Sequence, residues 1–397
     1  MTKATPKALT KDPSNKDTMD RRKRMTSLLN LNRASGFIPG ILDECRRMHS
    51  TLKDGVKQDM GNSINCLIFE IIANIFFGDD VNEITKKLRA YKNPDGTVEQ
   101  IPIRDMLTRL PKAFLMQLYN PLTTALPFLN NYDLAGPYKR DRENLECCRQ
   151  GLDEALKATQ DKKSVYYQLT QMDGYKKDVM FDDLMSFTVA AFETSAKTIC
   201  STLYFLKKKP LVLKKLREEL KENGFTKGVD IKEICTMEKV QDLDYMTNVI
   251  KEAMRIDSPV SETFPYTCLE DVEICGVPLP KDTMIKLDLY TGHYDETAWL
   301  HPREFIPERF DVESDFYKLS VKEGKERNVY SRRTFSHGFR MCPGQSLGFL
   351  QVRVILAYLL SHIDYEFEPE LLDKEGVGFG FGSEIPFEAK VIKEFSL

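Results

Sequence analysis

One uninterrupted helical stretch, residues 181–207, constrains the fold of this 397-residue chain more than any other feature. Apolar side chains recur through it at helical spacing, with the acidic pair Asp182 and Asp183 near its start and three lysines, 207–209, at its end. Acidic residues near a first turn and basic residues near a last turn suit the helix dipole. The pattern predicts a long central helix.

Further helices and short strands are predicted on both sides of this stretch. Helical spacing predicts helices at residues 21–31, 64–77, 145–159, 211–223, 242–256 and 346–362. Short runs broken by Gly and Pro predict hairpins at 272–274, 277–279 and 284–289, and a strand pair is expected around 376–382. Residues 101–138 fit short helices over an apolar cavity or membrane surface, or plain core packing. The predicted fold class is mainly α with a small β-rich subdomain, in a single large domain.

Composition excludes several classes of protein. With 42% hydrophobic and 29% charged residues, the chain has the balance of a soluble globular protein, although its polar first 19 residues are expected to be disordered, which leaves 20–397 as the domain. A net charge of −3 argues against a nucleic-acid partner. The most apolar stretch, 64–77, is interrupted by Asn65, Glu70 and Asn74, so no transmembrane anchor is expected.

The cysteines indicate the compartment. Nine cysteines, an odd number without paired spacings, fit neither a disulfide framework nor a zinc framework. The N-terminus also lacks the pattern of a secretory signal peptide. We therefore expect a reducing, cytosol-facing location, with the endoplasmic reticulum surface and peripheral membrane contact as the expected membrane association.

The segment Phe335-Ser-His-Gly-Phe-Arg-Met-Cys-Pro-Gly344 carries the strongest chemical signal. It places Cys342 directly before a long apolar helix, where the helix dipole and free backbone N–H groups favour a thiolate. Gly338 and Gly344 would let the backbone approach a large flat ligand, and Arg340 could meet an anionic group on it. The loop therefore suggests a ligated cofactor with acidic substituents.

The pattern Phe-x-x-Gly-x-Arg-x-Cys-x-Gly is complete in this loop, at Phe335, Gly338, Arg340, Cys342 and Gly344. It resembles the haem-thiolate loop of the cytochrome P-450 superfamily. The resemblance implies haem b as the cofactor, with the Cys342 thiolate as axial ligand of the iron and the other loop residues around it.

Two further segments resemble a structural motif of the superfamily. Glu252 and Arg255 stand three residues apart on a predicted helix, so they can pair on one face. The segment 305–310, with sequence Phe-Ile-Pro-Glu-Arg-Phe, carries Arg309. The resemblance implies that Glu252, Arg255 and Arg309 form a buried structural triad.

The middle of the long helix resembles the oxygen-activation motif of the superfamily. Ala190-Ala-Phe-Glu-Thr-Ser195 places Glu193 and Thr194 where the family has its acid and threonine, so the resemblance implies that they deliver protons. Read alone, a mid-helix threonine usually bonds back to a carbonyl one turn earlier. Ala191 stands where the family usually has glycine, which adds a methyl group near the expected oxygen site.

The N-terminal side matches the superfamily less completely. The family helix equated with 21–31 usually carries a Trp, which is missing, and an Arg that binds a haem propionate, for which Lys23 or Arg24 is the candidate. Tyr266 occupies the place of another propionate-binding Arg. The expectation is that the chain lacks the usual N-terminal lobe and membrane anchor, as a fragment or as a reduced protein.

The remaining candidates are histidines and a basic stretch. His49, His301 and His362 lack partners at metal-ligand spacing and are not candidates for the site. His293 and His337 are the histidines for which contact with the cofactor stays open. Residues 322–333 carry five basic against two acidic side chains, which predicts a docking surface for an acidic electron donor, unless they are simply a solvated charge run. The basic residues are Lys322, Lys325, Arg327, Arg332 and Arg333.

Together these features predict an oxidoreductase that inserts one atom of O2 into an apolar small molecule. Sterols, fatty acids and xenobiotics are the open substrate classes, so lipid or xenobiotic metabolism is the expected role. Because no Gly-rich dinucleotide fingerprint follows a strand, NADPH would act only through a partner reductase or another electron donor. The alternatives are a haem-thiolate isomerase or dehydratase of a hydroperoxide, and a truncated haem-binding protein without activity.

Overall fold

The computed structural model describes most of the chain. The described residues are 15–78, 81, 86–106, 109, 126, 138–158, 161–263, 265–325, 327, 330–373 and 387–393. The predicted loose region 101–138 and the Gly-rich turn at 376–382 therefore lie largely or wholly outside them.

Helices dominate the described part of the chain, as the sequence predicted. The longer helices are α1 (Lys16–Leu28), α3 (Ile38–Thr51), α4 (Met60–Phe77), α8 (Tyr138–Ala158), α10 (Lys177–Lys208), α11 (Pro210–Glu222), α14 (Asp244–Ile256), α15 (Asp315–Lys322) and α16 (Gln345–His362). Shorter helices are α2 (Leu31–Ala34), α9 (Val165–Thr170), α12 (Ile231–Ile234), α13 (Met237–Gln241) and α17 (Pro369–Asp373). Single 3-10 turns are η1 (Ser35–Phe37), η4 (Thr291–His293), η5 (Pro307–Phe310) and η6 (Gly338–Arg340).

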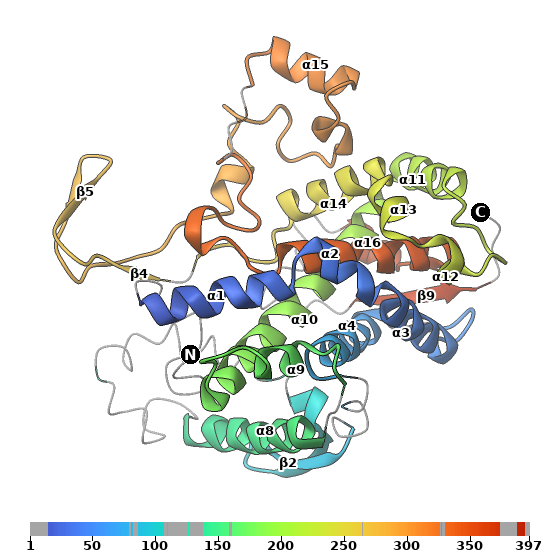
Figure 1. Cartoon of the computed structure of the whole chain (residues 1–397). Helices are drawn as coiled ribbons and strands as arrows, with labels where there is room; N and C mark the ends of the chain where they lie inside the picture. The colour runs from blue at the N-terminus through green and yellow to red at the C-terminus, as the bar shows by residue number, and fades with distance from the viewer. Residues whose placement is uncertain are drawn as a thin grey trace.

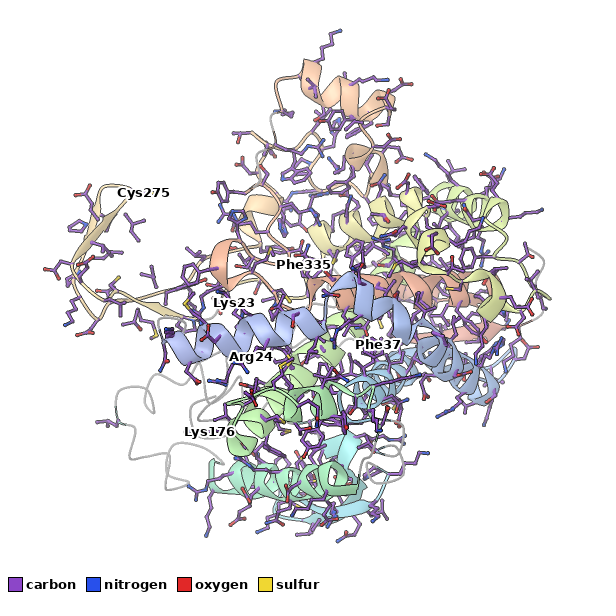
Figure 2. All side chains as sticks on the ribbon, viewed as in Figure 1. Lys23, Arg24, Phe37, Lys176, Cys275 and Phe335 are labelled. Carbon is purple, nitrogen blue, oxygen red and sulfur yellow. The ribbon has the colours of Figure 1, made fainter. Side chains whose placement is uncertain are left out.

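The strands form small antiparallel sheets at the edge of the helical body. One sheet has the order β1 (Lys57–Asp59), β9 (Glu388–Ile392), β8 (Asp364–Glu366). The two-stranded pairs are β2 (Leu88–Lys92) with β3 (Val98–Pro102), β4 (Tyr266–Thr267) with β7 (Met284–Ile285), and β5 (Val272–Ile274) with β6 (Val277–Leu279). The hairpin of β5 and β6 extends away from the body, with Cys275 at its tip (Figures 1 and 2).

Helix α10 runs through the middle of the molecule (Figure 1). It packs most extensively against α4 and also contacts α14, α16 and α11. Its apolar residues, among them Leu184, Ile199 and Leu203, belong to one continuous buried core that includes both α4 and α16. The long central helix predicted from the sequence is confirmed, and the structure extends it by four residues at its N-terminus.

The acidic pair near the start of α10 serves a different purpose from the one the sequence suggested. Because the helix begins at Lys177, Asp182 and Asp183 lie beyond its first turn, and both are buried. The Asp183 carboxylate accepts hydrogen bonds from Arg21 at 2.6 Å and Tyr175 at 2.5 Å, while Asp182 pairs with Arg149 at 2.6 Å. These residues attach α1 and α8 to α10 rather than complementing the helix dipole.

Two other expectations about the N-terminal half need correction. Helix α1 begins at Lys16, inside the segment 1–19 expected to be disordered, because Asn15 caps its first turn and Arg21 is held by Asp17 and Asp183.

The hairpin of β2 and β3 was not predicted. Its strands are short and half exposed, so they carry little apolar alternation, and only the turn residues Asn93-Pro-Asp-Gly96 signalled it.

Helix α4 is long and apolar enough to cross a membrane by length and composition, over Met60–Phe77. In this structure 61% of that window is buried within the protein, against α10 and α3. The helix therefore serves as a core helix here.

Candidate functional site

The loop that carries Cys342 is shaped by its own backbone. The Cys342 N–H donates to the Phe335 carbonyl at 2.9 Å, and the Met341 N–H donates to the Gly338 carbonyl at 3.0 Å. Gly338 has a φ of +70°, a conformation that glycine adopts without steric cost. The loop therefore brings Phe335 and Cys342 together before α16 begins, and the Phe335 ring packs edge-on against Phe349 of that helix at 6.3 Å.

The thiol of Cys342 is protonated more firmly than the sequence suggested. Burial raises its pKa, which outweighs the opposing effects of the Gly344 N–H and the positive charge of Arg22. The backbone N–H at the start of the helix thus acts in the expected direction, and the desolvation of the sulfur opposes it with a larger effect. The sulfur becomes a thiolate when a cation binds it.

Two arginines lie beside this sulfur, and one of them differs from the candidate chosen from sequence. Arg22 of α1 donates to the carbonyl of Met341, next to Cys342. The predicted candidate Arg24 instead donates to the carbonyl of Asp173 at 2.6 Å, and it projects from α1 away from the loop (Figure 2). Residues two positions apart on a helix, such as Arg22 and Arg24, point about 200° apart. An error of two positions in aligning α1 with the family helix therefore chooses a side chain on the opposite face.

The other arginine, Arg340, lies where the loop motif predicted. Its guanidinium stacks over the ring of Tyr266 with 4.8 Å to the ring centroid. Tyr266 belongs to strand β4, so this contact packs β4 against one side of the loop. Arg22 and Arg340 thus both place positive charge at this loop.

Between residues 179 and 207, where burial is described throughout, helix α10 is exposed only near its middle, at Ala190. Its residues are buried from Phe181 to Thr188 and again from Ser195 onward along most positions, whereas Ala190 is exposed and Ala191 and Thr194 are partly exposed. A buried helix that opens in its middle to small side chains leaves room beside that turn. The predicted residues Ala191, Glu193 and Thr194 all lie on this stretch.

Thr194 makes the local hydrogen bond that its position favours. Its hydroxyl donates to the Ala190 carbonyl at 2.8 Å, as Thr188, Thr198 and Thr202 do to carbonyls one turn earlier. Those three threonines are buried, with 0 to 5% exposure. Exposure, rather than hydrogen bonding, distinguishes Thr194 from them.

One buried hydrogen bond connects the exposed turn of α10 with the helix that follows Cys342. The Gln351 side chain on α16 donates from Nε2 to the Ser195 hydroxyl at 2.6 Å, and both residues are buried. Ser195 follows Thr194 directly, and α16 begins three residues after Cys342. The structure thus attaches the two predicted functional segments to each other, a link that sequence reasoning missed because the two partners lie 156 positions apart.

The predicted triad is confirmed. Arg255 binds both carboxylate oxygens of Glu252 at 2.8 Å, and Arg309 binds one of them at 2.8 Å. All three side chains are at most 2% exposed. The two guanidinium groups also donate to backbone carbonyls of His293, Leu300, His301, Pro302 and Glu304, and both lie over the ring of Trp299.

His293 joins this triad to the cysteine loop. Its carbonyl accepts from Arg255 at 2.7 Å, and its Nε2 accepts the Arg333 backbone N–H at 3.0 Å. Burial, with the nearby charges of Arg255 and Arg332, lowers its pKa to about 4, so the ring is neutral. His337, in contrast, is exposed and packs edge-on against Tyr330 at 4.9 Å.

Part of the basic stretch ahead of the loop packs against aromatic rings. The Arg327 guanidinium donates to the Arg309 carbonyl and stacks over Trp299 and Tyr317. Arg332 lies over Phe310 at 5.6 Å, and burial lowers its pKa. Two of the five predicted docking cations therefore face inward, because aromatic rings beside the triad attract them.

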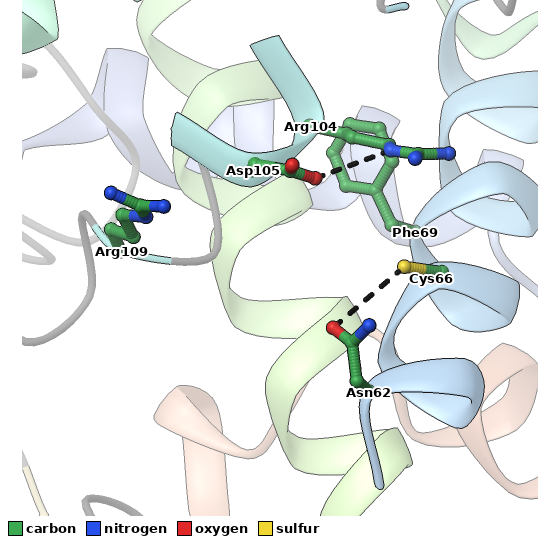
Figure 3. Close-up of a pocket in the computed structure, with 6 residues that line it drawn as sticks. All are labelled: Asn62, Cys66, Phe69, Arg104, Asp105 and Arg109. Carbon is green, nitrogen blue, oxygen red and sulfur yellow. Dashed lines mark hydrogen bonds and ion pairs between the residues drawn. The ribbon is translucent and has the colours of Figure 1, made fainter. Parts of the chain in front are cut away.

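A small cavity lies elsewhere, beside α4 (Figure 3). Its volume is about 160 Å³. The lining residues are Asn62, Cys66, Phe69, Arg104, Asp105 and Arg109. None of the predicted site residues lines it, so it does not belong to the candidate site.

Within the described ranges, no three His, Cys, Asp or Glu side chains gather closely enough to hold a metal ion. Cys342 is therefore not part of such a cluster in those ranges.

Comparisons with known proteins address the family of the chain. The sequence profile described as "Cytochrome P450" matches residues 5–380. Cytochrome P450 71B1 of Thlaspi arvense is 32% identical over 212 residues, covering 52% of this chain and 40% of that protein. Tabersonine 16-hydroxylase 1 of Catharanthus roseus is 25% identical over 349 residues, covering 82% of this chain and 62% of that protein.

A mouse protein, cytochrome P450 3A41, is 30% identical over 180 residues, or 45% of this chain and 33% of its own length. The matched parts of these three relatives thus range from about a third to three fifths of their length.

Proposed function

This chain belongs to the cytochrome P450 family, and from that premise we propose that it binds haem through the Cys342 sulfur and acts as a monooxygenase. The observation that carries the proposal is the hydrogen bond between Gln351 and Ser195, at 2.6 Å. It ties the helix that follows Cys342 to the turn of α10 that carries Thr194. A ligand held by the sulfur and reactants beside Thr194 would therefore share one site.

The residues of the site fit a haem group. A single sulfur ligand matches an iron whose four equatorial ligands come from a macrocycle. Arg22 and Arg340 supply positive charge beside the sulfur for carboxylate substituents, and the positive φ of Gly338 forms the turn that presents the loop. Haem with a thiolate ligand supplies O2 binding and O–O bond cleavage.

The chain's own residues would divide the remaining work. Ala190 and Ala191 leave an open apolar surface on α10 for a substrate and for O2. Thr194 offers a hydroxyl oxygen that can accept a hydrogen bond from a water while the hydroxyl donates its own hydrogen bond to the Ala190 carbonyl. Glu193, one residue earlier, would supply protons to that water.

The electron donor and the substrate are further parts of the proposal. NADPH-derived electrons would arrive from a reductase at the surface near the Cys342 loop, where Arg333 is partly exposed. The inward packing of Arg327 and Arg332 leaves this face with fewer free cations than the sequence suggested. An apolar small molecule, a sterol, a fatty acid or a xenobiotic, suits the alanine-lined turn, and a cytosol-facing membrane surface suits such a substrate.

Reconstitution with NADPH and a reductase tests this proposal. We expect stoichiometric haem, a red-shifted Soret band in the reduced carbon-monoxide complex, and O2 uptake that depends on NADPH. A haem-thiolate isomerase would show the band and convert a hydroperoxide without NADPH. Protein that takes up no haem would contradict the proposal entirely.

A further inference from the structure

Glu193 and Lys197 form an ion pair on the exposed turn of α10. Glu193 Oε1 lies 2.9 Å from Lys197 Nζ, one helical turn later, and the two side chains are only 16% and 15% exposed. Two comparable pairs, Asp153 with Lys157 and Lys214 with Glu218, are between 42% and 75% exposed. The Glu193 pair is therefore largely withdrawn from solvent, whereas these two are ordinary surface pairs.

The second oxygen of Glu193 has no partner. Among the described residues nothing donates a hydrogen bond to Glu193 Oε2, although this oxygen is buried. A buried carboxylate oxygen without a donor costs free energy, so such atoms usually hold a water or a ligand. The carboxylate is thus fixed at one oxygen and available at the other.

The surroundings of Lys197 keep it in place as a charged partner. Burial lowers its pKa, but the carboxylates of Glu193 and Asp257, together with Cys200, act in the opposite direction. Asp257 is buried at the C-terminus of α14, two residues after Arg255 of the triad. The ammonium group therefore interacts with acidic groups from two helices.

Stability alone does not account for such a pair. Exposed helix pairs contribute about 0.3–0.5 kcal/mol, and removing a pair from water adds a desolvation cost. A partly buried pair with one unsatisfied oxygen, directly beside Thr194, is better explained by what the free oxygen binds.

We propose that Lys197 is a positioning residue that fixes Glu193 through Oε1, so that Oε2 holds the water from which protons reach the Thr194 turn. This inference rests on the proposed monooxygenase function, and it adds a residue for which sequence reasoning predicted no role. Without Lys197 the carboxylate would lose its fixed orientation, and an arginine at the same position would restore it.

The first test measures uncoupled turnover in the haem-loaded protein. When protons do not reach the site in order, NADPH, O2 and one proton yield NADP⁺ and hydrogen peroxide. We expect Lys197→Met to raise the peroxide released per NADPH by about tenfold, the size of effect that loss of a supporting hydrogen-bond partner has at other metal sites. Lys197→Arg should restore the parental ratio, and the double variant with Glu193→Gln should release no more peroxide than either single variant.

Lys157→Met, which removes the matched surface pair, should leave the peroxide ratio unchanged. A Lys197→Met protein with the parental ratio would overturn the inference. So would a double variant whose effects add, because additive effects would mean that Lys197 does not act through Glu193.

The second test reports on the ion pair without turnover. Lysines carrying ¹³C-methyl groups can be titrated by NMR in the diamagnetic carbon-monoxide complex. Glu193→Gln should lower the pKa of Lys197 by about 1–3 units, because an adjacent carboxylate stabilises the ammonium form. Asp153→Asn should move Lys157 much less, since that pair is exposed.

An unchanged Lys197 titration would show that the pair does not form and would end the inference. Failure of the proposed function looks different, because the protein would then take up no haem. The same titration on the protein as purified would still report whether the pair exists.

Discussion

The Glu252 triad and the Cys342 loop lie close together in the structure, but they satisfy their polar groups in opposite ways. In the triad, two guanidinium groups and one carboxylate bind one another and a set of backbone carbonyls, and all three side chains are at most 2% exposed. In the loop, the backbone supplies the hydrogen bonds, while Arg340 and Cys342 keep partial exposure. The triad is complete without a ligand, whereas the loop presents a sulfur and cations toward one.

His293 connects these two regions through one residue. Its backbone carbonyl belongs to the triad and its ring holds the backbone at Arg333, two positions before Phe335. The difference teaches that the rigid region supports the open one. Changes in the loop should alter ligand binding at constant stability, and changes in the triad should alter stability first.

The largest effect is expected in the loop, on ligation. Cys342→Ser removes the candidate thiolate, so the reduced carbon-monoxide complex should lose its red-shifted Soret band completely. Cys275→Ser is the matched control, because Cys275 is exposed at the tip of the hairpin of β5 and β6. A Cys342→Ser protein that retained the band would assign the ligand to another residue.

In the triad, removing one partner leaves an uncompensated buried charge. Arg309→Ala should lower the free energy of unfolding by about 3–5 kcal/mol, with loss of haem as a consequence. Chemical denaturation measures this, and Arg303→Ala at an exposed position should change stability by no more than about 0.5 kcal/mol. If the Arg309 variant unfolded at the parental denaturant concentration, the triad would not be the rigid region.

The link between α16 and α10 should have a smaller effect. Gln351→Leu leaves the buried Ser195 hydroxyl without its partner, which should lower the unfolding free energy by about 1–3 kcal/mol. Adding Ser195→Ala should recover most of this loss, because both polar groups are then absent. Denaturation of the three variants measures the coupling, and additive losses in the double variant would mean that the two side chains do not interact.

The smallest effect concerns pH, through His293. Because burial lowers its pKa to about 4, the unfolded chain binds a proton near pH 6.5 that the folded chain does not. The free energy of unfolding should therefore fall as the pH falls below 6.5 towards 4. Between pH 7.5 and pH 6, the range to be measured, the His293 contribution to this fall is about 1 kcal/mol.

Unfolding free energies of the parent and a His293→Gln variant across this range measure the slope. The His293→Gln variant should lose the His293 contribution to the slope of unfolding free energy against pH. His301→Gln, at an exposed position, should retain the parental slope. Identical slopes in the parent and the His293 variant would show that the ring is not buried as a neutral group.

The sequence by itself determined the features that depend on neighbours along the chain. The spacing of apolar residues predicted α10, α11, α14 and α16 within a few residues, because helical periodicity is a local property. The loop motif identified Cys342 and Arg340 for a similar reason, since its residues lie within ten positions of one another. The triad was also predicted, but through family resemblance, since Arg309 is 57 positions from Glu252.

Which side chains meet across helices depends on how the helices pack, and sequence patterns did not predict it. The tertiary structure selected Arg22 over Arg24, because the face of α1 that meets the loop depends on how α1 packs. It also turned Arg327 and Arg332 inward and connected Gln351 with Ser195. Burial also opposes the effect of the helix N-terminus on the Cys342 pKa, and this desolvation depends on everything packed around the sulfur, not on the adjacent helix alone.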